Sequence, residues 1–384
     1  MRDFLIIARA DTIYWYSVYD RPSGFVEWGS KFGKGNLSPL MLLDTREAEK
    51  RKKDNTAQCI TLQNIKSVAA LCTRQYVKPG PDYLCHADKT LPSDLRKQWV
   101  EPLRHELTLP TAAEADRCPP LVLESVPQRF LPVEFKCLSQ TTEDGILLYL
   151  LAAIGTQTRR AIEIAGGIGW ENNVANLVVN FGFDALFFDG DPGNSRCARN
   201  FFRTHTATAA RFEQGVWWSS DFVTTDNINE IVTNITGWSG DIDVLSVDID
   251  GVDYWILKAL TVVRPRIVVV EIQELWGATV RRTRPYRQDH RSPEIAAMGA
   301  SLGAFTWLLE QRDYRLVGCM RAGFNAFFVR NDVRQGNIED IFGSEVYDSN
   351  GCFAHVDAAW AKTLETRRAA ANKYDWVDPA SADQ

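Results

Sequence analysis

Residues 161–173, with the sequence AIEIAGGIGWENN, decide the fold of this chain. An apolar strand over 161–164 carries one acid, Glu163, and leads into a glycine-rich turn, after which an apolar helical run covers 174–179. Glycines let the backbone bend sharply and let a ligand approach the main chain. The glycines of this turn are Gly166, Gly167 and Gly169. We therefore expect a strand, a ligand-binding turn and a helix in succession.

The turn lacks the features that bind a phosphate group. It matches neither GxGxxG nor GxxxxGK[ST], and residues 165–169 contain no Lys or Arg. Glu163 beside the turn would repel a pyrophosphate. A ligand with an ammonium group and ribose hydroxyls fits better, which favours S-adenosylmethionine over NAD or ATP. A tight packing turn without a ligand is the alternative explanation.

Composition predicts a globular protein with a main domain and an extension. The chain has 384 residues, 45% of them hydrophobic and 24% charged. The net charge of −6 argues against a nucleic-acid partner or an anionic membrane surface. No apolar run approaches the roughly 18 residues of a membrane span. The eight cysteines form no CxxC pair, and Cys85-His86 lacks a second half of a metal site, so we expect a soluble, reduced, cytoplasmic protein without zinc.

Strands and helices alternate from residue 161 onward, which predicts an α/β fold with a parallel sheet covered on both faces. The predicted strands are 161–164, 185–188, one within 215–224, 242–247 and 266–272. A helix over 294–312 precedes two antiparallel strands, 314–320 and 325–330. A C-terminal antiparallel hairpin beside a parallel sheet is typical of methyltransferases rather than dehydrogenases.

Three domains follow from this pattern: an N-terminal α+β extension over 1–130, a ligand-binding domain over 131–335 and a C-terminal helical tail over 336–384. Residues 4–8 are expected to form a strand, and the tail contains one helix candidate, 356–373. The extension fits two roles, a dimerisation arm in a homodimer or a wall of the acceptor pocket.

Acids stand at the ends of four predicted strands, where open α/β sheets bind their ligands. They are Glu163, Asp189 with Asp191, Asp248 with Asp250, and Glu271. Each could cap the next helix, but four strands delivering acids to one rim predicts a cationic or hydroxyl-bearing ligand. Asp189, with Gly190 after it, is placed one βα unit after Glu163, where an acid binds ribose hydroxyls.

Two further cofactor contacts are predicted. Asp221 and Phe222 could hold adenine, although Phe222 is also explained by ordinary core packing. Gln140 precedes an apolar helix and could lie over the cofactor. The alternative for that segment is a capped helix start, in which Glu143 and Asp144 complement the helix dipole.

The run 139–330 resembles the class I S-adenosylmethionine-dependent methyltransferases, and most closely the FkbM-type O-methyltransferases. The matching pieces are SQTTEDGILL (139–148), EIAGGIGWENN (163–173), FFDGDPGN (187–194), SVDIDGVDYWILKAL (246–260) and RPRIVVVEI (264–272). The resemblance implies a Rossmann-like seven-stranded sheet, S-adenosylmethionine as cofactor and methyl transfer. It also implies binding roles for Gln140, Glu163, Gly167, Gly169 and Asp189.

Two positions depart from the family pattern. Ala165 stands where a first glycine is common, and because Gly166 and Gly167 follow, a shifted turn is the simplest interpretation. Asp250 stands where FkbM-type sequences usually carry Glu, so the acid is shorter by about one bond.

Methyl transfer needs a base near the acceptor. Asp248 and Asp250 are candidate bases, or they could bind a divalent cation such as Mg²⁺ together with Glu271. His290 is a third candidate base, with an ordinary surface histidine as its alternative. The surrounding segment favours an anionic acceptor because it is rich in arginine. Its arginines are Arg281, Arg282, Arg284, Arg287 and Arg291.

The leading functional hypothesis is methylation of a hydroxyl on a small molecule, a secondary metabolite or a sugar. An N- or C-methyltransferase on the same fold is the second hypothesis. A protein that binds S-adenosylmethionine without methylating anything is the third.

Overall fold

The computed structural model describes residues 4–9, 12–17, 59–75, 102–103, 105, 107–123, 129–289, 298–333, 348–353 and 358–381. The chain forms two compact units, 1–58 and 59–384. The unit that holds the main sheet thus starts at Cys59, whereas the sequence suggested a boundary after residue 130. Within the first unit, β1 (Phe4–Arg9) pairs antiparallel with β2 (Thr12–Ser17), which confirms the predicted N-terminal strand.

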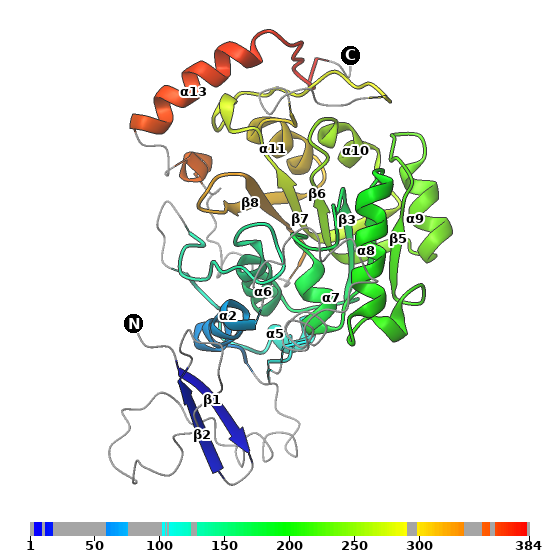
Figure 1. Ribbon diagram of the computed structural model, residues 1–384. Coiled ribbons are helices and arrows are strands. Elements are labelled where there is room, and N and C mark those ends of the chain that lie inside the picture. Colours follow the sequence, from blue (N-terminus) through cyan, green and yellow to red (C-terminus); the bar gives the residue numbers. More distant parts are fainter. Residues whose placement is uncertain are drawn as a thin grey trace. The chain divides into compact units, whose positions relative to one another are not determined.

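The second unit is built on a seven-stranded sheet (Figure 1) with the order β5-β4-β3-β6-β7-β9-β8. The first five of these strands run parallel, and β9 is antiparallel to both of its neighbours. The strands are β3 (Arg160–Ile164), β4 (Asp184–Phe188), β5 (Val216–Ser219), β6 (Gly240–Val247), β7 (Val263–Glu271), β8 (Tyr314–Cys319) and β9 (Asn325–Arg330). The predicted α/β class, the seven-stranded Rossmann-like sheet and the antiparallel hairpin are confirmed.

Helices cover both faces of this sheet, because alternate strand residues point to opposite sides. Ala161 and Val244 pack in one apolar core with α6, α7 and α8, and Ile162 and Leu245 pack in the other with α9, α10 and α11. The helices are α6 (Glu143–Ile154), α7 (Ala175–Phe181), α8 (Pro192–Thr204), α9 (Ile228–Thr236), α10 (Asp253–Ala259) and α11 (Leu302–Glu310). Two helices before the sheet, α2 (Leu62–Gln75) and the short α5 (Ala112–Ala115), belong to the same unit.

The helix predicted over 294–312 is shorter in the structure. Helix α11 starts at Leu302, and the hydroxyl of Ser301 accepts a hydrogen bond from the backbone N–H of Ala304, which is the contact of an N-cap. Residues 298–301 are not helical, and 290–297 lie outside the described residues. The C-terminal candidate is confirmed as α13 (Ala358–Ala371), the red helix of Figure 1.

The expectation of reduced cysteines is wrong. Disulfides join Cys59 to Cys118, Cys72 to Cys137 and Cys319 to Cys352, and Cys197 is also disulfide-bonded. Sequence spacing could not show this, since the cysteines of the three described pairs lie between 33 and 65 residues apart. Disulfides are rare in the cytosol, so the redox argument for a cytoplasmic location is lost. Among the described helices, none combines the length and apolar character needed to cross a membrane.

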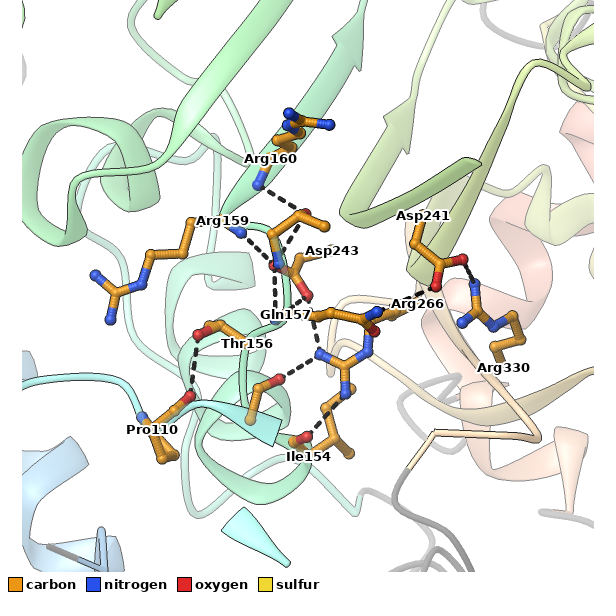
Figure 2. A network of polar contacts seen from close by, with 12 residues as sticks. Pro110, Ile154, Thr156, Gln157, Arg159, Arg160, Asp241, Asp243, Arg266 and Arg330 are labelled. Carbon is orange, nitrogen blue, oxygen red and sulfur yellow. Dashed lines mark hydrogen bonds and ion pairs between the residues drawn. The ribbon is translucent and has the colours of Figure 1, made fainter. Parts of the chain in front are cut away.

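A buried ion pair holds the amino edge of the sheet (Figure 2). Nη1 of Arg266 lies 2.9 Å from Oδ1 of Asp243, and the two side chains are 2% and 0% exposed. Asp243 also accepts three backbone N–H groups from the loop before β3. Arg266 donates to the carbonyls of Ile154 and Gly155 at the end of α6. The pair therefore fixes α6 relative to the strand that leads into the glycine turn.

Candidate functional site

The turn after β3 uses three left-handed backbone positions. The φ angle is +64° at Ala165, +54° at Gly167 and +81° at Gly169, and Gly166 is not among the positive-φ residues. Ala165 itself is therefore the first of the three positions, and the interpretation as a shifted turn is wrong. A Cβ at Gly169 would lie 2.9 Å from Cα of Ala198, so the turn packs directly onto α8.

Glu163 ends up buried beneath this turn, with 4% exposure. Its two carboxylate oxygens accept the backbone N–H groups of Asn173 and Val174 at 2.7 and 2.9 Å, where α7 begins. Burial raises the pKa of Glu163 to about 8, and the two N–H donors act in the opposite direction. Its predicted contact with the amino acid end of a cofactor stays a prediction.

Asp189 follows β4 on the same rim and is half-buried. Its oxygens accept the backbone N–H of Asp191 at 2.8 Å and the side-chain amide of Asn194 at 3.3 Å. Burial raises the pKa of this carboxyl, while hydrogen bonds, including one from the backbone of Gly167, lower it. Asp189 therefore faces the glycine turn from the neighbouring strand. Asp191 instead caps α8 by accepting the N–H of Asn194.

The predicted adenine contacts lie next to Asp189. A Cβ at Gly190 would come within 2.8 Å of the ring of Phe222, so the glycine lets this aromatic ring pack against the main chain. Phe222 is half-buried, and Asp221 is exposed and accepts the hydroxyl proton of Ser219 at 2.6 Å. These contacts place Asp189, Gly190, Asp221 and Phe222 near one another at the ends of β4 and β5.

The loop that carries Gln140 runs beside the exit of the glycine turn. Ser139 forms a parallel bridge with Glu171, and the carbonyl of Leu138 accepts the N–H of Asn172 at 3.0 Å. Gln140 is exposed, whereas Ser139 is fully buried. The loop thus places Gln140 at the rim next to the turn.

A second group of acids lies beyond β6 and β7. Carboxylate oxygens of Asp248, Asp250 and Glu271 all lie within 4.8 Å of one another. Burial and the neighbouring acids raise the pKa of Asp248 to about 7 and that of Glu271 well above its ordinary range. The carboxyl groups of Asp248 and Glu271 also share a hydrogen bond, which requires a proton on one of them. This pair can therefore exchange a proton with a bound molecule.

The turn that bears these acids is organised by Asp253. Its buried carboxylate accepts the N–H groups of Ile249 and Gly251 at 2.5 and 2.9 Å. Asp250 has a φ of +60°, a left-handed position that a residue with a side chain adopts at a cost. Asp250, which stands where FkbM-type sequences usually carry Glu, therefore lies in a strained turn that Asp253 stabilises.

The arginine-rich segment mainly contacts the C-terminal residues. Arg281 pairs with Asp378 at 3.3 Å, and Arg284 lies over the rings of Tyr374 and Trp376. The guanidinium of Arg284 also donates to the backbone carbonyl of Asp375 in the C-terminal segment. These two arginines anchor the C-terminal residues, so the anionic acceptor stays a prediction that rests on the remaining ones. His290 and Arg291 lie outside the described residues.

Sequence reasoning missed two residues of this site. Asp253 stands three positions after Asp250 in the run DIDGVD, so its position next to known acids was a usable signal. Asn325 gave no signal, because it is far from Glu271 in the chain and becomes its neighbour only through the pairing of β7 with β9. Its side-chain amide donates to Glu143 at 2.8 Å, which links the start of α6 to the acid group.

No protein-family model and no curated protein matches this chain. Solved structures similar to part of it include the N-terminal domain of EvdMO1 with SAH bound, at 15% identity over 50% of this chain and 80% of that chain, with a TM-score of 0.33. The O-methyltransferase TomG from Streptomyces achromogenes, in complex with SAM, has 16% identity over 51% and 83%, with a TM-score of 0.33. Spermidine synthase from Thermotoga maritima has 12% identity over 53% and 67%, with a TM-score of 0.29. Because these identities and TM-scores are low, function is inferred below from the strand order and from the site residues.

Proposed function

We propose that this chain transfers a methyl group from S-adenosylmethionine to a hydroxyl of a small molecule. The observation that carries the proposal is the row of acids that β3, β4, β6 and β7 bring to one rim of the sheet. Glu163 is buried there, and Asp189, Asp248 and Glu271 are half-buried. Buried carboxylates are costly unless something cationic or hydrogen-bonding sits among them. A donor with a sulfonium and an ammonium group would supply that charge, which a pyrophosphate would not.

The residues along this rim match the parts of this donor. Asp189 would accept the ribose hydroxyls, and Gly190 with Phe222 would hold the adenine. The turn from Ala165 to Gly169 would let the donor approach the main chain. The methionine end would then lie near Gln140 and towards Asp248.

The acceptor hydroxyl must lose its proton as it attacks the methyl carbon in line with the sulfonium. The pair Asp248–Glu271 is the best candidate for this general base, because a pKa of about 7 matches a base at neutral pH. Asp250, with a carboxylate oxygen within 4.8 Å of those of Asp248 and Glu271, would help to bind the acceptor. A methyl transfer to nitrogen would need less help from such a base.

The same three acids would also suit a divalent cation such as Mg²⁺. Three carboxylates whose oxygens lie within 4.8 Å of one another form an oxygen donor set of the kind that Mg²⁺ and Ca²⁺ prefer. A cation held by Asp248, Asp250 and Glu271 would lower the pKa of an acceptor hydroxyl.

Transfer of a radiolabelled methyl group from S-adenosylmethionine to a panel of hydroxylated metabolites and sugars tests the proposal. We expect labelled product with the wild type and at least a 100-fold lower rate for Asp248→Asn and Glu271→Gln, since a positioned base contributes about 10²–10⁴-fold. Asp226→Asn, at an exposed acid, serves as the control and should keep the wild-type rate. Donor binding without transfer to any acceptor would instead favour a non-methylating protein.

A further inference from the structure

Asp144 binds the loop before its own helix rather than the helix itself. A single oxygen, Oδ2, accepts the backbone N–H groups of Cys137, Leu138 and Ser139 at 2.6, 2.8 and 2.8 Å. The same oxygen accepts the hydroxyl proton of Ser139 at 2.7 Å. All four donors precede α6, whereas a helix cap would use N–H groups within its first turn. Dipole complementation alone therefore does not explain this acid.

Glu143 holds the other side of the same loop. Its carboxylate accepts the hydroxyl proton and the backbone N–H of Thr141 at 2.5 and 3.0 Å. It also accepts the side-chain amide of Asn325, the register partner of Glu271. Ser139 and Thr141 are thus both fixed, and Gln140 between them is the exposed residue.

The fixed loop lies against the glycine turn through its bridge between Ser139 and Glu171. The carbonyl of Gln140 accepts the ammonium group of Lys136 at 2.6 Å, and that ammonium lies 3.7 Å from the carboxylate of Glu171. A disulfide also ties Cys137 to α2. The loop is therefore held at every residue from Cys137 to Thr141 except for the side chain of Gln140.

We infer that Asp144 is a positioning residue for donor binding, whose carboxylate holds the loop so that Gln140 can contact the donor at the glycine turn. This inference rests on the proposed function. Asp144 touches neither the donor nor the acceptor and acts through the loop. A buried carboxylate whose donors all lie outside its own helix is a costly way to stabilise a loop, but it is a direct way to shape a binding site.

The unpartnered oxygen of Asp144 allows a sharp substitution test. Oδ1 is buried without a hydrogen-bond partner. In Asp144→Asn, the amide oxygen can take the place of Oδ2, and the amide nitrogen can take the unpartnered place. Asp144→Ala removes the acceptor for all four donors. A role through the acceptor oxygen therefore predicts rescue by asparagine.

Isothermal titration calorimetry with S-adenosylhomocysteine as the probe measures the effect. We expect Asp144→Ala to weaken binding 10-fold to 100-fold and Asp144→Asn to stay within about 3-fold of the wild type, the scale of a few charged hydrogen bonds. Thr111→Ala, which removes the side-chain cap of α5 at the opposite edge of the sheet, is the matched control and should leave affinity unchanged. Unfolding curves in urea show whether each variant is folded under the conditions of the titration.

Three outcomes are distinguishable. Wild-type affinity in folded Asp144→Ala would overturn the inference and leave the proposed function standing, and so would an equal loss in both Asp144 variants. Absence of binding in the wild type would overturn the proposed function and the inference with it. If Asp144→Ala does not fold, Ser139→Ala replaces it, because it removes one of the four donors; 3-fold to 10-fold weaker binding supports the inference, and unchanged affinity overturns it.

Discussion

Ala165 and Gly167 adopt the same left-handed backbone, with φ angles of +64° and +54°, at alternate positions of one turn. Only Gly167 has the residue type that this conformation favours. The left-handed conformation costs an L-residue about 1–2 kcal/mol, and the extra chain entropy of glycine offsets about 0.5–1 kcal/mol of that. We expect Ala165→Gly to raise the free energy of unfolding by about 0.5–1 kcal/mol, as measured in urea.

The reverse substitution, glycine to alanine at Gly182, is the control for this prediction. It has a φ of +71°, and a Cβ there would meet nothing within 4 Å, so backbone strain is the main change. Gly182→Ala should destabilise the fold by about 1 kcal/mol. If Ala165→Gly destabilised the protein instead, the side chain of Ala165 would have to contribute packing that exceeds its strain.

The ion pair between Asp243 and Arg266 should be costly to break. Removal of one partner leaves the other charge buried and unpaired, which typically costs about 3–5 kcal/mol. We expect Asp243→Ala to lower the free energy of unfolding by this amount in urea. The exposed pair of Arg203 with Glu213 is the control, since Arg203→Ala should cost less than about 1 kcal/mol. A loss of under 1 kcal/mol for Asp243→Ala would contradict the role given to the pair.

Glu163 should make stability depend on pH. Burial raises its pKa from 4.5 to about 8 in the folded chain, so folding favours the protonated form. The stability that this preference contributes is fully present below about pH 4.5 and is lost as the pH rises to about 8. Unfolding measured at pH 6 and pH 8.5 should therefore show a decline in the wild type and a smaller one in Glu163→Gln. Equal declines would show that Glu163 does not carry this dependence.

The disulfides predict that the folded protein carries oxidised cysteines, as proteins of oxidising compartments do. Mass spectrometry after alkylation without reductant should find no modified thiol at Cys72, Cys137, Cys319 or Cys352. The loop closed between Cys72 and Cys137 spans 65 residues, and a cross-link of that length stabilises by about 4 kcal/mol in the chain-entropy account. Reductant should lower the melting temperature and, through Cys137, weaken donor binding. Free thiols at these positions in active protein would contradict the prediction of these disulfides.

The sequence predicted the sheet well because strong signals were local. Apolar runs ended by acids located β3, β4, β6 and β7 within a few residues. The parallel pairing of these strands puts their carboxyl ends on one rim, where Asp248, Asp250 and Glu271 lie close together. The turn at Ala165 was misjudged because its neighbouring glycines offered an equally good local solution. A Cβ at Gly166 would lie 2.6 Å from the side chain of Asn172, so the glycine there is explained by close packing and not by a left-handed backbone.

The remaining misses depend on contacts that no local pattern encodes. The disulfides join residues far apart in the chain, and the link between Glu143 and Asn325 spans 182 positions. The sequence offered no partners for the arginine-rich segment, because those partners, Asp378 and Trp376, lie about 90 residues downstream. Asp144 looked like a helix-dipole acid, and only its upstream donors show otherwise.

Binding of S-adenosylmethionine, measured by titration calorimetry with wild type and Asp189→Ala, tests the central claim most directly. We predict one donor per chain and binding weakened about 10-fold to 100-fold by the substitution, since Asp189 would lose charged hydrogen bonds to the ribose. Asp191→Ala, which removes only the cap of α8, should bind like the wild type. Absence of binding to the wild type, or an unchanged affinity in Asp189→Ala, would contradict the account.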